Sequence, residues 1–558
     1  MPACFLLVLG GFFLGFSGSV DDAHITYWPA WTLAHEGQLL NFNFEHIEQS
    51  SALGQVLLLA MLHKLTGLPV VTLAHVSTLF AALLCLWLTA KTSAGLHVAQ
   101  GEPATGMLAA LLLATSPFFV YWSYAGMEGP WLALLMLAML VVVASFLQHG
   151  TSVFPLFAVS LATQMMRPEA PAVLCVFGAT VLLLAILLQQ RSPWTWRRAL
   201  PVLCVQLIVA LLLVSWRADT FHAWLPQPVN AKTGGALWPQ LLAGWQYLRT
   251  IWMDRYLILS GLLLLAGAVY VVGRLRVLFW QLGVLMLLVY AAFVIGSGGD
   301  WMAAGRFWVP VMPLVALLTA QALCGFFQHK FIRYALLLVI LVSNIAYLWR
   351  GTALDFNSVP LWSANRLLET DGAAGYSFFE KHARENLQSI PLLAFVKPVL
   401  GQLVAARQQQ QPVQIMAGQM GMVPFYLSQA FPRQLRFTDR NGITETLLTD
   451  CPVARGLPRT RNGIGTGYAW VLEHRTALAA QCGFVMPDLV FDIDTGWNKR
   501  NIQALEQAGY VFIYRQRDRQ PDATKWLPLR PIYASLFIAA SPGTWRLLGS
   551  PAPVNRDF

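Results

Sequence analysis

The amino-acid sequence predicts a polytopic α-helical membrane protein that carries a C-terminal α/β domain outside the membrane. Of the 558 residues, 56% are hydrophobic and only 11% are charged. Together with a mean hydropathy of +0.55, this excludes an ordinary soluble domain. Long apolar runs recur up to about residue 350, and the composition turns mixed and polar from about Asp355. We therefore expect a transmembrane domain over residues 1–350 and an extracytoplasmic domain over residues 351–558.

The transmembrane part contains eleven apolar segments that we expect to cross the membrane. A helix needs about 17–25 mostly apolar residues to span the hydrocarbon core. The first segment lacks a basic N-terminal region, so we expect an uncleaved anchor rather than a signal peptide. The expected spans lie near residues 3–19, 69–90, 106–123, 130–148, 152–166, 170–189, 200–216, 256–272, 277–296, 307–325 and 333–350.

The distribution of basic residues predicts how these helices are oriented. Lys and Arg gather in the loops on one side of the membrane. Apart from Glu102, these loops contain almost no acidic residues. By the positive-inside rule that side is cytoplasmic, as is the N-terminus, and the tail after Arg350 lies outside. The loops concerned carry Lys91, Arg191, Arg197, Arg198, Arg274, Arg276, Lys330 and Arg333.

Residues 51–66 are apolar, but counting them as a crossing would invert every later loop. The segment is also short and carries His63 and Lys64. We expect it to form a helix that lies in the outer membrane interface, beside an amphipathic stretch from Tyr27 to His46.

The net charge of +10 does not indicate a nucleic-acid partner. Much of the excess lies in the short basic loops, and no basic run with interleaved aromatic residues is present. The expected partner is the lipid bilayer.

The tail alternates short β-rich runs with helical patterns, which predicts a small α/β domain. The expected strands lie at Val413–Met416, Leu489–Asp492 and Val511–Tyr514, with a helix at Lys499–Ala508. Cys451 and Cys482 lie in this tail. In an oxidising compartment they either form a disulfide or remain two separate buried thiols. No CxxC spacing indicates a metal site.

Five polar clusters stand at the ends of the expected spans, and the topology puts all of them on the outer side. Polar residues at the mouths of transmembrane segments usually mark substrate or ion sites. We therefore expect one composite site. The candidate residues are Asp21, Asp22, His24, Glu128, Arg167, Glu169, Asn230, Lys232, Asp300, Trp301 and Arg306.

The acidic candidates have functional and structural interpretations. Asp21 and Asp22 suit a catalytic base with a positioning partner, ligands of a hard cation, or solvated loop acids. Glu128 follows a turn and can cap the next helix. Asp300 is less easily read as a solvated acid, because two glycines before it allow close backbone approach. Trp301 can stack on a sugar or anchor the interface.

The basic candidates also have two interpretations. Arg167 and Arg306 stand at membrane depth, where each can grip a lipid phosphate or extend to the lipid head groups. Lys232 follows turn residues and, taken alone, would be a solvated lysine.

Read in order, these clusters resemble the GT-C glycosyltransferases that use polyprenyl-phosphate sugars. The closest likeness is to the terminal β-arabinofuranosyltransferase of the mycobacterial cell wall and its bacterial relatives. It covers residues 20–320, with a weaker echo in the tail. The strings that carry it are DDAHITYWPAWTLAHEGQLLNFN, YAGMEGPW, MRPEAP, WLPQPVNAK and GGDWMAAGRFWVP, then GQMGMVPFY and DRNGIT.

The resemblance implies an inverting transfer of a sugar from a polyprenyl phosphate to a hydroxyl of a glycan, glycolipid or protein. It implies a multi-pass enzyme of the bacterial inner membrane whose C-terminal domain is periplasmic. The base would be the first acid of the pair, Asp21, or its neighbour Asp22. Arg167, Arg306 and Lys232 would stabilise the departing phosphate. No cofactor is certain, but Asp21, Asp22 and Asp300 could hold a divalent cation such as Mg²⁺, Mn²⁺ or Ca²⁺.

The chain departs from the family pattern in three places, which puts the sugar in question more than the reaction. His24 stands where Tyr is usual, Gln227 interrupts the LPN string, and Met127 replaces a common Leu. His24 could tune the carboxylate or contact the sugar, and arabinofuranose or another pentose is the expected donor sugar.

Two other functions remain open. A transporter or flippase of a lipid-linked sugar would have broken helices and charges near mid-membrane, whereas here the charges gather at one face. A GT-C oligosaccharide ligase or protein glycosyltransferase differs mainly in its acceptor, which the sequence does not identify.

Overall fold

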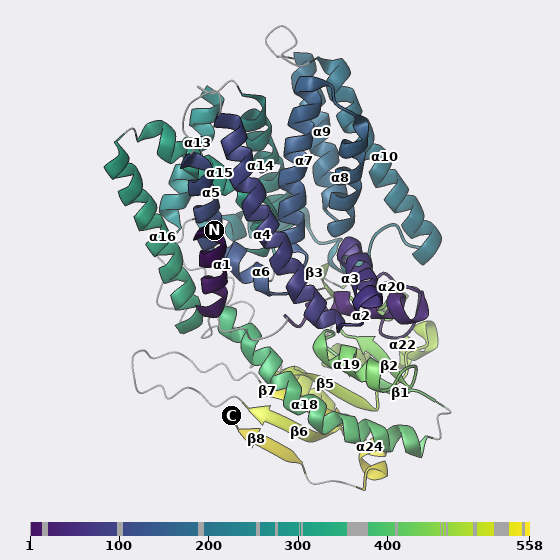
Figure 1. The fold of residues 1–558 in the computed structure, drawn as a ribbon. Helices are drawn as coiled ribbons and strands as arrows, with labels where there is room; N and C mark the ends of the chain where they lie inside the picture. The colour runs from purple at the N-terminus through teal and green to yellow at the C-terminus, as the bar shows by residue number, and fades with distance from the viewer. Residues whose placement is uncertain are drawn as a thin grey trace.

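The computed structural model has two parts, a bundle of helices and an α/β unit that adjoins one end of the bundle (Figure 1). Elements up to α16 belong to the bundle, and those from α18 onward belong to the α/β unit. The structure describes residues 2–13, 20–97, 104–187, 195–252, 257–273, 277–300, 302, 305–327, 329–353, 378–407, 411–457, 459–460, 463–464, 467–494, 499–517, 535–549 and 553–557.

Every segment expected to cross the membrane coincides with a helix or a pair of helices. Their burial against one another follows from apolar runs with no polar face to present to water. They are α1 (Pro2–Phe13), α4 (Val70–His97), α5 (Ala104–Thr115), α6 (Pro117–Tyr124), α7 (Gly129–His149), α8 (Val153–Met166), α9 (Ala170–Leu187), α10 (Trp196–Phe221), α13 (Ile258–Gly273), α14 (Leu278–Gly296), α15 (Met312–Phe326) and α16 (Lys330–Ala353).

Several of these helices have the length and apolar composition to span a bilayer. Six helices in the described part have the length and apolar composition for it, or seven if one bent pair counts as a single span. That pair is α5 and α6, expected as one helix over 106–123, which bend by 63°. The break is at Ser116, whose extended backbone (φ −60, ψ 120) is what a following proline favours.

Two short helices lie at the end of the bundle that faces the α/β unit, α2 (Ala23–Glu36) and α3 (Leu53–Thr66) (Figure 1). α3 has 14 residues, so its length of about 21 Å is short for a crossing. Its exposed side chains include Met61 and Leu65. A short helix with an exposed apolar side fits the interfacial position expected for residues 51–66.

The far ends of the helices carry several of the basic loop residues. Figure 1 shows the end of α9 and the start of α10 at the opposite end of the bundle from the sheet. Arg198 donates to the carbonyls of Leu147 (3.1 Å) and Gln148 (2.9 Å) at the end of α7. Arg333 likewise donates to Phe327 O (3.2 Å) after α15. These guanidinium groups satisfy carbonyls that a helix end leaves unpaired.

The α/β unit is built on a six-stranded mixed sheet with the order β2-β1-β5-β7-β6-β8. β1 pairs in parallel with β2 and β5, and β7 runs antiparallel between β5 and β6. The strands are β1 (Val413–Ala417), β2 (Leu435–Asp439), β5 (Leu489–Asp494), β6 (Val511–Arg517), β7 (Ser535–Ala540) and β8 (Val554–Asp557), and β3 (Arg459–Thr460) and β4 (Gly463–Ile464) form a separate hairpin. The three predicted strands are β1, β5 and β6.

Helices cover both faces of this sheet, because its strands bury alternate residues on opposite sides. Ile415 and Ile538 belong to the core shared with α18, whereas Met416 and Phe537 belong to the core shared with the later helices. The helices are α18 (Phe378–Ala406), α19 (Met422–Ala430), α20 (Leu447–Asp450), α21 (Tyr468–Glu473), α22 (Arg475–Cys482), α23 (Lys499–Gln507) and α24 (Pro542–Leu547).

The α/β unit docks on the loop between α2 and α3 through hydrogen bonds. Asn43 exchanges two with the backbone of Phe437 on β2, at 2.8 and 2.7 Å. Asn41 donates to Thr444 O at 3.2 Å. Buried amide side chains that pair with backbone groups fix the register of such a contact. The α/β unit is therefore attached to the end of the bundle that carries α2 and α3.

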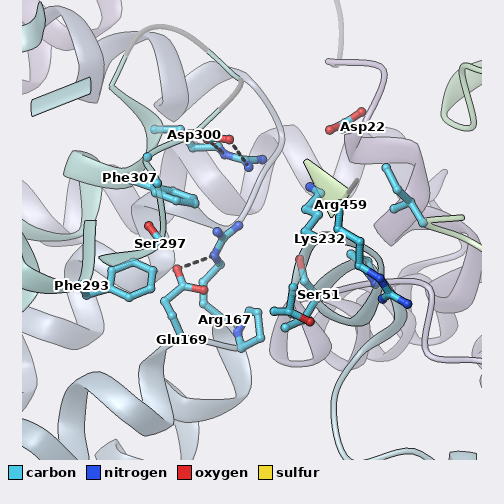
Figure 2. A pocket seen from close by; sticks show the side chains of 18 of the residues that line it. Asp22, Ser51, Arg167, Glu169, Lys232, Phe293, Ser297, Asp300, Phe307 and Arg459 are labelled. Carbon is cyan, nitrogen blue, oxygen red and sulfur yellow. Dashed lines mark hydrogen bonds and ion pairs between the residues drawn. The ribbon is translucent and has the colours of Figure 1, made fainter. Parts of the chain in front are cut away.

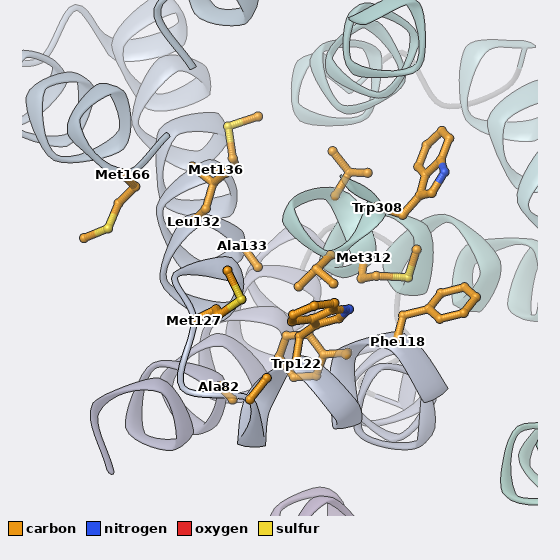
Figure 3. Close-up of a cluster of buried hydrophobic side chains, with 14 of the residues drawn as sticks. Ala82, Phe118, Trp122, Met127, Leu132, Ala133, Met136, Met166, Trp308 and Met312 are labelled. Carbon is orange, nitrogen blue, oxygen red and sulfur yellow. The ribbon is translucent and has the colours of Figure 1, made fainter. Parts of the chain in front are cut away.

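The core of the bundle packs beneath the polar clusters (Figure 3). Trp122 on α6 and Trp308, in the 3-10 helix η1 (Arg306–Val311), are each at most 2% exposed. Figure 3 shows Trp122 near Met127 and Met312. Aromatic and methionine side chains fill irregular space between helices. They support the turns that carry Glu128 and Arg306.

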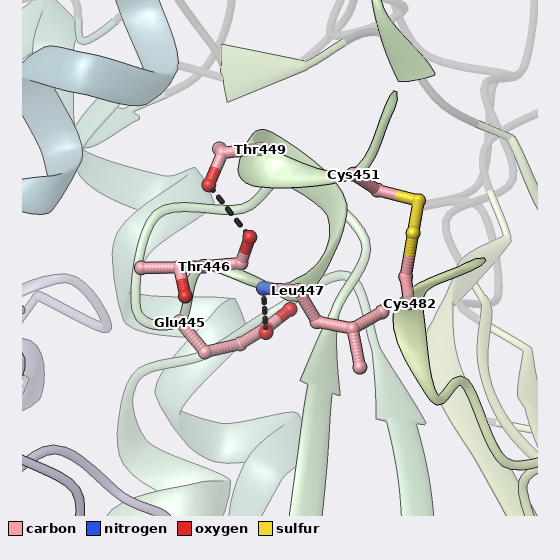
Figure 4. Close-up of a disulfide and its surroundings, with 6 residues drawn as sticks. All are labelled: Glu445, Thr446, Leu447, Thr449, Cys451 and Cys482. Carbon is pink, nitrogen blue, oxygen red and sulfur yellow. Dashed lines mark hydrogen bonds between the residues drawn. A yellow bond between two sulfur atoms is a disulfide. The ribbon is translucent and has the colours of Figure 1, made fainter. Parts of the chain in front are cut away.

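A disulfide joins Cys451 and Cys482, with their Cα atoms 5.7 Å apart (Figure 4). It connects the end of α20 to the end of α22. A cross-link of this kind restricts the unfolded chain and braces the segment that contains α20. The other cysteines among the described residues form no disulfide; they are Cys4, Cys85, Cys175, Cys204 and Cys324.

Candidate functional site

A cavity of about 570 Å³ lies where loops at one end of the bundle, the ends of the helices and the α/β unit meet (Figure 2). Seven of the eleven residues predicted from the sequence line it: Asp22, Glu128, Arg167, Glu169, Lys232, Asp300 and Arg306. These residues come from five separate loops. Their convergence on one cavity is what the expected composite site requires.

Arg167 stands at the end of α8, between two carboxylates. Its NH1 atom lies 2.6 Å from Glu128 Oε1, and its Nε atom lies 2.8 Å from Glu169 Oε1. Its side chain is only 9% exposed. Ion pairs this buried hold each other in fixed geometry, because either charge alone would be costly. The three residues form a rigid charged wall of the cavity.

Arg306 and Asp300 form a second buried pair on the same side. The guanidinium donates to both carboxylate oxygens, from Nε at 2.5 Å and from NH2 at 3.0 Å. This is the bidentate arrangement that arginine and carboxylate groups favour.

The glycines before Asp300 allow α12 (Leu237–Trp252) to approach. Gly298 and Gly299 have φ values of +82° and +73°, a region that favours glycine. A Cβ at Gly299 would lie 2.6 Å from the Tyr247 side chain, and one at Gly298 would lie 3.0 Å from Gln240. The close approach expected from the two glycines is therefore made by a helix of this chain.

Phe307 links the two arginines. The guanidinium carbons of Arg167 and Arg306 lie 5.4 and 5.6 Å from the centre of its ring. Cations attract the face of an aromatic ring at such distances. The ring helps to hold two like charges near each other at the cavity wall.

Lys232 ends α11 (Gln227–Lys232) and differs from these arginines. Its side chain makes no hydrogen bond or ion pair with the residues that the structure describes. Figure 2 shows it between Asp22 on one side and the Asp300 and Arg167 clusters on the other. Burial lowers the pKa of Lys232, and the charges of Arg306 and Arg167 add to this. An ammonium group in this setting favours an anionic ligand.

The two acids of the first loop face different ways. Asp22 lines the cavity. Asp21 is 9% exposed, and its Oδ1 atom accepts a hydrogen bond from the backbone N–H of Met422 at 2.7 Å. Gly421 packs so closely on Asp21 that a Cβ there would overlap it. The GQMGMVPFY string of the α/β unit thus holds Asp21, and the neighbouring carboxylate remains at the cavity.

Other predicted residues lie away from the cavity lining. His24 is fully buried against Tyr27 and Phe425, with ring centres 5.0 and 5.3 Å away. Burial lowers the pKa of His24 to about 4, which leaves the ring neutral near pH 7. The side chain of Asn230 donates to Leu225 O at 3.3 Å. Trp301 lies outside the described residues.

The candidate cation has little support in this donor set. Within the described part of the chain, no group of three or more His, Cys, Asp or Glu side chains is arranged to hold a metal ion. Asp300 is engaged by Arg306, and Asp21 by Met422. A hard cation needs several free oxygen ligands. A bound cation therefore stays a prediction.

The structure adds residues that sequence reasoning did not identify. Arg459 and Ile443 bring the α/β unit to the cavity lining. Ile443 lies in the DRNGIT string, where Asp439 accepts backbone hydrogen bonds from Asn441, Ile443 and Thr444 at 2.8–2.9 Å. Because the DRNGIT string is part of the family resemblance, the sequence contained a signal that this segment contributes to the site. Nothing in the local sequence distinguishes Arg459 from other basic residues of the tail.

Sequence comparison identifies no relative of the chain. No protein-family model and no curated protein sequence matches it. Structure comparison does find similar chains. ArnT from Cupriavidus metallidurans bound to undecaprenyl phosphate has a TM-score of 0.55 at 12% identity, over 97% of this chain and 98% of that chain. The chain has the GT-C fold.

Two further structures agree with this assignment. The apo form of the same ArnT has a TM-score of 0.52 at 12% identity, over 96% of this chain and 97% of that one. The apo oligosaccharyltransferase of Archaeoglobus fulgidus has a TM-score of 0.51 at 10% identity, over 95% of this chain and 76% of that one. The GT-C resemblance of the sequence motifs is thus confirmed at the level of the fold.

Proposed function

We propose that the protein is an inverting glycosyltransferase that moves a sugar from a polyprenyl phosphate to an acceptor hydroxyl. The observation that carries this proposal is the cavity in which Asp22 faces the ammonium group of Lys232 and the two buried arginine clusters. A carboxylate and several cations in one cavity match the two demands of the reaction, proton removal and stabilisation of a departing phosphate. The GT-C fold, shared with a protein that binds undecaprenyl phosphate, supports a lipid-linked donor.

In the proposed reaction, Asp22 is the general base. The acceptor hydroxyl attacks the anomeric carbon from the face opposite the phosphate, the bond from that carbon to the phosphate oxygen breaks, and the hydroxyl proton passes to Asp22. The polyprenyl phosphate leaves with the bonding electrons. A carboxylate of ordinary pKa near ~4 is a weak base, so proton transfer accompanies attack. Asp22 is preferred over Asp21 because Asp22 lines the cavity and Asp21 does not belong to its lining.

Lys232 is the proposed first contact of the departing phosphate. It makes no ion pair with described residues, so its charge is available to a ligand. Arg167 and Arg306 already have carboxylate partners and would contribute through the remaining N–H groups and their fixed position. Preorganised cations of this kind stabilise charge without reorganising during the reaction.

A pentose such as arabinofuranose is the proposed sugar, and it rests on the order of the sequence motifs. The acceptor is a hydroxyl of a glycan, glycolipid or protein. We place the cavity and the α/β unit on the outer, periplasmic side of a bacterial inner membrane, with the N-terminus in the cytoplasm, because the basic loops favour this orientation. A transporter of lipid-linked sugar is disfavoured because the charged groups gather at one end of the bundle.

The test is a transfer assay with the purified protein in lipid nanodiscs and a radiolabelled undecaprenyl-phosphate pentose. Removing the base should lower the rate by about 10²–10⁴-fold in Asp22→Asn, as is typical for general-base catalysis. Asp21→Asn should lose less. Asp219→Asn, at an exposed acid near the end of α10, is the matched control. Parallel assays with EDTA and with added Mg²⁺, Mn²⁺ or Ca²⁺ test the cation.

Near-normal transfer by Asp22→Asn would exclude Asp22 as the base. Loss confined to Asp21→Asn would return the role to the first acid. If the donor crossed the bilayer of proteoliposomes without losing its sugar, a transporter would replace the glycosyltransferase proposal.

A further inference from the structure

The α/β unit contacts the loop that carries Lys232 through one buried side chain, Gln227. This glutamine begins α11 and is 5% exposed. Its Nε2 atom lies 2.8 Å from Gly442 O, 3.0 Å from Glu445 O and 2.9 Å from Thr449 Oγ1. All three partners can accept, and Thr449 gives its own proton to Thr446 O. The amide nitrogen, with its two hydrogens, therefore has to face the α/β unit.

A second contact holds the other end of the same loop. The Arg459 guanidinium donates to the carbonyl of Asn230, and also to Thr449 O at 3.4 Å. A Cβ on Gly235 would lie 3.2 Å from Arg459 O, so the chain beyond Lys232 packs directly on β3. Thr449 is the common point of both contacts, since its side chain receives Gln227 and its carbonyl receives Arg459.

The bundle side of α11 is fixed as well. The backbone N–H of Gln227 donates to Glu48 O at 3.0 Å, and the Glu48 side chain pairs with Arg217 at 2.8 Å. The backbone of Gln227 is thus hydrogen-bonded to the bundle, whereas its side chain is hydrogen-bonded to the α/β unit. Gln227 and Arg459 thus hold the backbone on either side of Lys232, whose own side chain makes no hydrogen bond or ion pair with the described residues.

From this geometry we infer that Gln227 is a positioning residue, which couples the α/β unit to the placement of Lys232 in the cavity. The inference rests on the proposed function for the role of Lys232, but the coupling itself is a property of the structure. We name the residues 227, 449 and 459 the α11 latch. The disulfide at Cys451 lies two residues beyond Thr449 and braces the turn that receives the latch (Figure 4).

The main variant is Gln227→Glu, which keeps the volume but replaces the donor by a carboxylate facing three acceptors. Buried polar groups left without partners cost more than a hydrogen bond contributes. The matched control is Gln38→Glu, the same substitution at an exposed outer position. Thr449→Val, which removes one acceptor and keeps the shape, is the milder variant in case Gln227→Glu does not fold.

The first readout needs no activity. Lys232→Cys is labelled with a water-soluble maleimide in the otherwise natural background and in the Gln227→Glu, Thr449→Val and Gln38→Glu backgrounds. Protein with Lys232 intact corrects for the natural thiols. We expect labelling of the introduced thiol to speed up by about tenfold in Gln227→Glu, as when a local closing energy of about 1.4 kcal/mol is lost. Thr449→Val should give a smaller increase, and Gln38→Glu none.

The second readout is steady-state transfer by variants that retain Lys232. Gln227→Glu should raise KM for the lipid donor more than it lowers kcat, since it displaces a phosphate contact and leaves the base in place. Labelling rates and KM equal to those of the Gln38→Glu control would overturn the inference. If Asp22→Asn keeps full transfer while labelling of the introduced thiol still responds to the latch, the proposed base fails and the latch stands.

Discussion

The two sides of the cavity differ in how their charges are satisfied. On the bundle wall, formed by Glu128, Arg167, Glu169, Asp300 and Arg306, each guanidinium has carboxylate partners within 2.5–3.0 Å. On the loop wall, formed by Asp22, Lys232 and Arg459, Lys232 makes no ion pair with described residues and Arg459 donates to backbone carbonyls.

This difference distinguishes charged groups that stabilise the fold from a charged group that is available to a ligand. Buried ion pairs keep one arrangement because breaking either partner leaves an unpaired charge in a poor solvent. A cation held by its backbone alone can exchange water for a ligand at little structural cost. In the proposed reaction, the bundle wall would set the shape and the electrostatic field of the site, and the loop wall would contact the reacting groups.

The largest effect should come from breaking the bundle wall. Arg306→Gln leaves the Asp300 carboxylate, 5% exposed, without its cation. Removing one partner of a buried pair typically costs about 3–5 kcal/mol. We expect a clear fall in the thermal unfolding midpoint, followed by intrinsic tryptophan fluorescence, and loss of transfer.

The double variant Asp300→Asn/Arg306→Gln removes both charges of the ion pair at once. It should recover part of the stability, since it no longer buries a lone charge. An Arg306→Gln protein as stable as the natural one would mean that the bundle wall is not held by its ion pairs.

Changing the loop wall should affect chemistry and leave the fold unchanged. Lys232→Gln should not lower the stability, because the neutral amide avoids the desolvation cost that the buried ammonium group carries. Transfer should fall by about 10²–10³-fold, as when one stabiliser of an oxyanion is removed. Unfolding and transfer measured on the same preparations give both values. A stability loss like that of Arg306→Gln would erase the distinction between the two walls.

The pKa of Lys232 offers a second test of the difference between the loop wall and the bundle wall. Burial and the facing charges of Arg306 and Arg167 lower its pKa, against the opposing effect of Asp22 and Asp300. The ammonium therefore loses its proton at a lower pH than a free lysine, whose pKa is near ~10.4. Transfer should decline as the pH rises through this lowered pKa. Lys232→Arg should shift the decline to higher pH, because arginine stays charged. Identical alkaline limbs would exclude Lys232 as their source.

Much of the fold follows from the sequence because apolar length and charged loops are local signals. The positions of the helices were predicted from them, as was the presence of strands at Val413, Leu489 and Val511. The break at Ser116 was not predicted, because the length of an apolar run does not report where a helix bends. Among the described residues, six or seven of the eleven expected spans correspond to helices long and apolar enough to cross a bilayer.

The sequence predicted which loops form the candidate site. It did not predict which side chains contact one another there. Seven of the eleven candidate residues line one cavity because the topology puts their loops at the same end of the bundle. Which acid of the pair faces that cavity depends on Met422, some four hundred residues away. Arg459 and Gln227 act through contacts with distant segments. These contacts depend on tertiary packing, which cannot be predicted from a local sequence pattern.

The smallest expected effect concerns the support behind the loop wall. Glu445, whose carbonyl accepts from Gln227, is 4% exposed. Burial, and then the nearby Asp439, raises the pKa of Glu445 to about 8, above its ordinary 4.5. Because the folded protein binds this proton more tightly, the resulting stability is fully present below about pH 4.5 and is lost as the pH rises through about 8.

Glu445→Gln should remove this dependence, so the unfolding midpoint of the variant should change less between those two pH values than that of the natural protein. Glu473→Gln is the matched control, because that side chain is 63% exposed and its charge is solvated in both states. A slope equal to that of the control would mean that Glu445 is ionised without penalty. The bundle wall has no counterpart to this group, since its carboxylates are each paired with an arginine. A pH-dependent midpoint that remains in Glu445→Gln would arise from other buried titratable groups, among which Asp439 is the neighbouring acid whose pKa burial also raises.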